Sequence, residues 1–73
     1  MDANEILDLV ALKRKSFDVA NAARYDAQVA AESDPALIPA FEAAKAAQDD
    51  AATALGEAHD VLAAEINARV AAL

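Results

Sequence analysis

His59 is the single histidine of this chain, and it lies within an apolar stripe of the second half of the sequence. An imidazole can act as a pH-sensitive switch or as a metal ligand. A metal bound on one helix needs a second ligand three or four residues away, and those positions hold Leu55, Gly56, Leu62 and Ala63. The sequence therefore predicts no metal at His59. The ordinary expectation is a partly buried histidine that bonds across a helix interface, for example to Ser16.

The residue types that carry covalent catalysis are scarce. The chain has no cysteine, two serines and one threonine, and it contains no glycine-rich phosphate loop, paired-histidine motif or nucleophile motif. A chain of two helices also forms no cleft of its own that would exclude water. We therefore expect neither an enzyme nor a bound cofactor.

The charged residues argue against nucleic acid as a partner. The net charge is −7, whereas binding to phosphates depends on cationic side chains. The three consecutive bases at 13–15 fan out around a helix, and we expect them to be solvated and tied to acids such as Asp18. One helix face carries most acids of the second half, and it is either a solvated surface or a docking site for a basic partner: Glu42, Asp49, Asp50, Glu57 and Asp60.

The elements that hold these residues follow from alanine and proline. The chain has 23 alanines, one glycine and two prolines in 73 residues, and alanine is the strongest helix former. Pro35 and Pro39 mark the break between two long helical segments. We expect a single domain over 1–73, with a helix at about 3–32, a turn at 33–38 and a helix at about 39–72. Asp2 and Glu5 resemble a capping box at the first helix start.

Apolar side chains define the expected contact surfaces when the helices are read at 100° per residue. The predicted interface comprises Ile6, Leu9, Leu12, Phe17, Leu55, His59, Leu62, Ile66, Val70 and Leu73. A second contact line, roughly opposite on the first helix, contains Leu7, Tyr25 and Val29. Gln48 and Lys13 interrupt the stripes, and a polar residue in a helical seam often sets its register.

These patterns predict an all-α fold, an antiparallel two-helix hairpin that resembles a coiled coil and forms part of a larger bundle or assembly. Because the bulky side chains gather at the open end, we expect a partner to cover them, either a second copy or another protein. The expected function is a structural or interaction module, for instance an accessory subunit of a phage or similar particle. The alternative is an acidic inhibitor that binds a basic protein, resembling an antitoxin or mimicking nucleic acid.

The sequence also bears on location. Charges interrupt every apolar stretch, so no membrane-spanning helix is expected. The first residues are acidic where a secretory signal would be basic. We expect a cytoplasmic protein, or one held within a particle.

Overall fold

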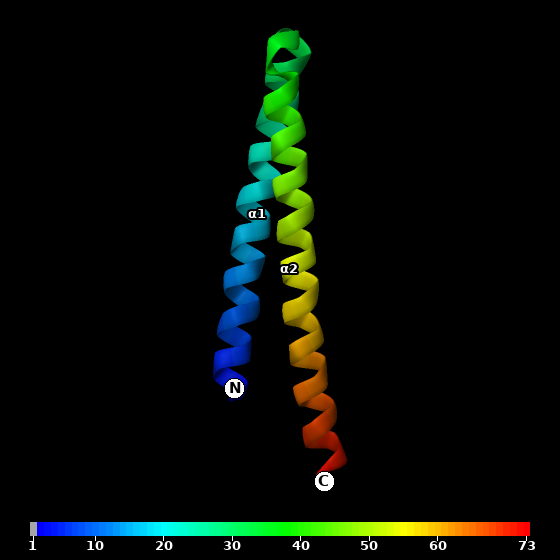
Figure 1. Cartoon of the computed structure of the whole chain (residues 1–73). Helices are drawn as coiled ribbons and strands as arrows, with labels where there is room; N and C mark the ends of the chain where they lie inside the picture. Colours follow the sequence, from blue (N-terminus) through cyan, green and yellow to red (C-terminus); the bar gives the residue numbers. More distant parts are fainter. Residues whose placement is uncertain (1) are drawn as a thin grey trace.

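A computed structural model describes residues 2–73 and confirms the all-α hairpin. Helix α1 spans Ala3–Ser33, a short 3₁₀ helix η1 spans Pro35–Leu37, and helix α2 spans Ile38–Ala71. The chain is 94% helical, without strands in its described part, and the two long helices pack side by side (Figure 1).

The start of α1 is capped as the sequence predicts. The Asp2 carboxylate accepts a hydrogen bond of 2.8 Å from the backbone N–H of Glu5, which satisfies one of the free donors of the first helical turn. At the other end, the backbone N–H of Asp34 donates to the carbonyl of Ala30 at 3.0 Å. Asp34 adopts an extended conformation, which ends α1.

The turn between the helices is built by Asp34 and two prolines. The Asp34 carboxylate accepts a 3.0 Å hydrogen bond from the N–H of Ala36 and so caps η1. Pro39 falls in the first turn of α2, where a backbone N–H has no helical acceptor and its loss costs nothing. The second proline is therefore compatible with α2, which begins one residue before it.

The hairpin is a narrow rod. Its extents are 58 × 15 × 14 Å, and its radius of gyration is 16.8 Å, against about 11 Å for a compact domain of this length. The last turns of α2 extend past the start of α1 (Figure 1). A rod of two helices has one internal interface and a large outer surface.

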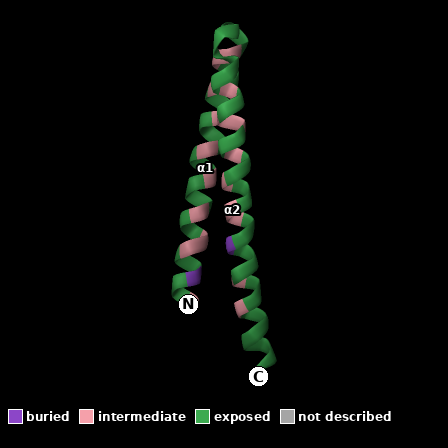
Figure 2. Ribbon diagram, in the orientation of Figure 1, coloured by how far each residue is buried: buried purple, intermediate pink, exposed green. Residues whose placement is uncertain are grey.

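Very little of the chain is buried. Ile6 and Ala58 are the two buried hydrophobic residues among those described, at 2% and 3% exposure. The partly buried residues form a stripe along the facing sides of both helices (Figure 2). The hairpin has a seam rather than a three-dimensional core.

Candidate interaction surface

The seam between α1 and α2 follows a strict heptad spacing. Besides Leu9, Ala30, Lys45 and Ala54, which are also partly covered, the covered residues of each helix recur at alternating steps of three and four, the 3.5-residue period of a coiled coil. On α1 they are Ala3, Ile6, Val10, Lys13, Phe17, Ala20, Arg24, Ala27 and Ala31. On α2 they are Phe41, Ala44, Gln48, Ala51, Leu55, Ala58, Leu62 and Glu65. We call these residues the inner seam.

A polar link crosses the inner seam near its middle. The Arg24 guanidinium donates to the Gln48 side-chain carbonyl at 2.6 Å, and the Gln48 amide donates to the Asn21 side-chain oxygen at 2.6 Å. The Nε of Arg24 is buried without a protein partner. Gln48, which the sequence singled out, thus lies in the seam and is bonded to α1. Arg24 and Asn21 were not anticipated.

The two flanks of the seam differ in chemistry. One flank, here called the polar side, is formed by Leu7, Arg14, Asn21 and Gln28 of α1 and Lys45, Ala52, His59 and Ile66 of α2. The opposite flank, the apolar side, is formed by Leu9, Ser16, Ala23 and Ala30 of α1 and Ala40, Ala47, Ala54, Val61 and Ala68 of α2. The apolar side carries no charged residue on either helix.

The surface hollows reflect this difference. On the apolar side a shallow groove of about 240 Å³ is lined by Leu9, Lys13, Ala54, Glu57, Ala58 and Val61. On the polar side a hollow of about 190 Å³ is lined by Asn21, Arg24, Tyr25 and Gln28. Both hollows are open to solvent, and each draws part of its lining from its flank. The groove also includes Lys13 and Ala58 of the inner seam and Glu57, and the other hollow includes Arg24 of the inner seam and Tyr25.

The structure divides the predicted interface residues into covered and exposed sets. Covered or half-covered within the hairpin are Ile6, Leu9, Phe17, Leu55 and Leu62; exposed are Leu12, His59, Ile66, Val70 and Leu73. All members of the predicted second contact line, Leu7, Tyr25 and Val29, are exposed as well. The covered set lies in or beside the inner seam, so the remaining residues are free to contact other protein.

The expectation of a partly buried His59 bonded to Ser16 is wrong for the hairpin. His59 is exposed, and the Ser16 hydroxyl donates instead to the backbone carbonyl of Leu12 at 3.1 Å. The cause is the helical period, because the strict heptad places Ala58 in the inner seam and turns its neighbour outwards.

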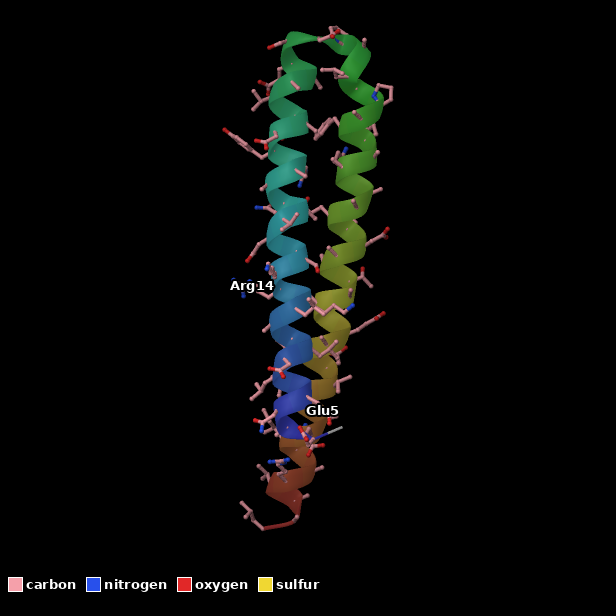
Figure 3. All side chains as sticks on the ribbon, turned by 90° about the vertical axis from the view of Figure 1, so that its left-hand side faces the viewer. Glu5 and Arg14 are labelled. Carbon is pink, nitrogen blue, oxygen red and sulfur yellow. The ribbon has the colours of Figure 1, made fainter. Side chains whose placement is uncertain are left out.

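Three of the six basic residues sit beside acids of their own helix, as expected for Arg14. Its Nε lies 3.6 Å from the Asp18 carboxylate, and Figure 3 shows its side chain pointing away from the hairpin. Lys45 lies 3.5 Å from Glu42, and Arg69 bonds Glu65 at 2.9 Å. These pairs are solvent-exposed and contribute little to stability.

Residues 2–73 lack two further features, a metal-binding cluster and a membrane-spanning helix. No group of three or more acidic or histidine side chains is placed to hold a metal ion. Neither long helix has a stretch both long enough and apolar enough to cross a bilayer.

The chain was also compared with known proteins. No family model, no curated protein and no solved structure matches it.

Proposed function

We propose that this chain is a non-enzymatic interaction module that works by packing its helical hairpin against protein, either a second copy or a larger assembly. A particle such as a virion, to which it would belong as an accessory subunit, is one setting for such a module. The basis of this proposal is the apolar surface that the hairpin leaves exposed.

The observation that carries the proposal is the imbalance between buried and exposed apolar side chains. Two hydrophobic residues are buried, while eleven large ones are exposed, among them Leu12 at 59% and Val19 at 63%. Single exposed apolar residues are common on protein surfaces, but contiguous ones mark interaction sites. Leu12 and Val19 lie seven residues apart on α1, and the partly covered Leu9 lies three residues before Leu12. Steps of three and seven are the spacing of a second helix-packing face.

A small chain needs such a partner for stability. Below about 70–80 residues, a hydrophobic core alone supplies only a few kcal/mol, and disulfides, metals or oligomers usually supply the rest. The chain has no cysteine. Disulfides are therefore not a route to a well-ordered hairpin, whereas contact with other protein is a route that the exposed apolar residues support.

Site-specific photo-crosslinking in the cells that produce the protein tests this function. A photoreactive amino acid at Val19, on the exposed apolar line, is expected to give one discrete protein adduct. The matched control is Ala22, which is also exposed but lies on the back of α1. Absence of any adduct at Val19, or equal adducts at both positions, would overturn the proposed function.

The acidic inhibitor is the second candidate, and the exposed acids of α2 favour it. Asp49, Asp50, Glu57 and Asp60 are all exposed, and the net charge of −7 would attract a basic protein. In that case the photoreactive group at Val19 would stay silent, and one placed at Asp60 would capture the basic partner. The crosslinking experiment thus separates the two functions.

A further inference from the structure

The apolar side of the hairpin is built to be covered without leaving a polar group stranded. Of its nine residues, eight are apolar, and Ser16 is the exception. The Ser16 hydroxyl already donates to the carbonyl of Leu12 at 3.1 Å. Because burial of an unbonded polar group is what penalises most surfaces, covering these nine residues costs little. Lys13 and Glu57 also line the groove of this flank, and their charged ends must stay in solvent at the rim when it is covered.

The polar side offers no comparable surface. Arg14, Asn21, Gln28 and Lys45 interrupt it on both helices. Arg14, Asn21 and Lys45 have a partner within the hairpin, but their remaining donors and the Gln28 amide would need new partners if they were buried. None of the six basic residues is among the nine residues of the apolar side, although Lys13 of the inner seam lines its groove. The apolar side is therefore the flank on which another pair of helices would pack.

The apolar side also tapers in side-chain size. Its bulky members, Leu9 and Val61, line the groove towards the open end, and Leu12 lies at its outer edge with 59% exposure. Towards the turn the same flank holds only alanine, at Ala23, Ala30, Ala40 and Ala47. The apolar side therefore has its large side chains near the open end and only small ones near the turn.

A second copy in the opposite direction matches this taper. With the turn of one copy beside the open end of the other, the bulky residues of each hairpin meet the alanines of its partner. A two-fold axis then repeats the same contact twice, and large against small is how cores reach full packing density. In a parallel pair, bulk would meet bulk at one end and alanine would face alanine at the other.

The surface area of the chain agrees with one such contact. The hairpin exposes 5124 Å², whereas a compact monomer of 7.6 kDa exposes about 4,300 Å². The excess is about 800 Å², which is the area that one partner contributes to a standard protein interface. One additional hairpin is enough to bring the exposed area of each chain to an ordinary value.

We propose that two copies of this chain pack their apolar sides together in antiparallel orientation and form a four-helix bundle. This inference rests on the proposed interaction function and names the partner and the surface. Leu9, Ser16, Val61 and Ala47 lie at the dimer contact, while the acidic back of α2 stays in solvent. Asp26, Asp50 and Glu57 lie at the rim of the contact.

Sedimentation equilibrium of two charge-matched variants tests the surface. Ala47 and Ala46 are adjacent, exposed and on the same helix, but only Ala47 is on the apolar side. Ala47→Glu is expected to raise the dimer dissociation constant by at least about 100-fold, since it buries a carboxylate among alanines. Ala46→Glu is expected to leave the constant within about threefold of the parent chain, as for other exposed helix positions.

Equal effects of the two substitutions would show that the apolar side is not the dimer contact. If the unmodified chain sediments as a monomer at every concentration, the proposal that a second copy is the partner is wrong. The proposed function would survive that result if Val19 still captured a different protein, so the two failures are distinguishable.

A distance measurement on the full chain tests the orientation without perturbing the contact. Because the chain has no cysteine, Ser33→Cys gives one spin-label site near the turn of each copy. In the antiparallel bundle the two labels lie at opposite ends, separated by most of the 58 Å length of the hairpin. Labels that lie side by side would contradict the antiparallel dimer, whatever the Ala47 variant shows.

Discussion

At the scale of single residues, the polar link in the inner seam is the feature with the largest energetic consequence. A partly buried guanidinium is costly unless bonded. Arg24 has the Gln48 carbonyl as a partner at 2.6 Å, while its Nε has no protein partner. Gln48 in turn holds Asn21 at 2.6 Å. Three polar side chains therefore determine each other's positions, and they fix which turn of α1 lies beside which turn of α2.

A double-mutant cycle measures this link. Gln48→Leu alone is expected to lower the free energy of unfolding by about 1–3 kcal/mol, because Arg24 loses its acceptor. The double variant with Arg24→Leu is expected to recover this loss, with a coupling energy of at least about 1 kcal/mol. Urea denaturation at one fixed protein concentration measures all four corners of the cycle.

Asn67→Leu is the control for that cycle, since Asn67 is an exposed polar residue on the back of α2. It should change stability by less than about 0.5 kcal/mol. Strictly additive effects of Gln48→Leu and Arg24→Leu would show that the link contributes nothing.

Sequence reasoning found one half of this link and missed the other, for a physical reason. Gln48 stands out because it interrupts an otherwise apolar stripe of alanines. Arg24 does not, since a long cationic side chain is ordinarily placed at the surface, with its stem on apolar groups and its charge in water. The three-and-four spacing from Phe17 through Ala20 to Arg24 is the signal that places it in the seam.

At the scale of the helix, the period decides which residues are covered. A straight helix at 100° per residue drifts by about 20° per heptad from the 3.5-residue repeat of a supercoiled pair. Over the length of α1 this drift moves the expected face by close to a quarter turn. Leu12 was placed in the face towards α2 but is exposed at 59%, and Val19, seven residues further on, is exposed at 63%.

The hairpin itself was predictable because its determinants are local. Each determinant acts within a few residues of the chain: the Asp2 cap, the Asp34–Pro35 helix start and Pro39. Each lies where the sequence suggested. The heptad seam depends on both helices winding around each other, which is a property of the pair. Faces read from one isolated helix therefore go wrong with distance along it.

A matched pair of substitutions on α2 tests the seam. Leu62 lies in the inner seam and is partly covered, whereas Ile66, one helical turn further on, is 52% exposed. Leu62→Ala is expected to destabilise the chain by about 1–2 kcal/mol, less than for a fully buried leucine. Ile66→Ala is expected to change stability by less than about 0.5 kcal/mol, since alanine also favours helix.

Thermal unfolding followed by circular dichroism at 222 nm, at equal protein concentrations, compares the two variants. A greater loss for Ile66→Ala than for Leu62→Ala would mean that the seam follows the straight-helix stripe and not the heptads.

At the scale of the whole molecule, charge and apolar surface act in opposite directions. Each chain has a net charge of −7, and three of its six basic residues sit beside acids of the same helix. Two copies brought together double the negative charge within one rod, and this repulsion opposes association. Apolar contact along the flank must outweigh the repulsion in the proposed dimer.

Salt is therefore expected to strengthen the dimer. Between 0.05 and 0.5 M sodium chloride the screening length falls from about 14 to about 4 Å, so repulsion between the acidic surfaces weakens while the apolar contact is retained. The dissociation constant should fall and the unfolding midpoint should rise, both by sedimentation and by circular dichroism. Salt would instead weaken the binding of a basic protein to the acids of α2, because it screens the attraction between opposite charges. Dimer affinity that decreases with salt would show that charge attraction, and not the apolar side, holds the copies together.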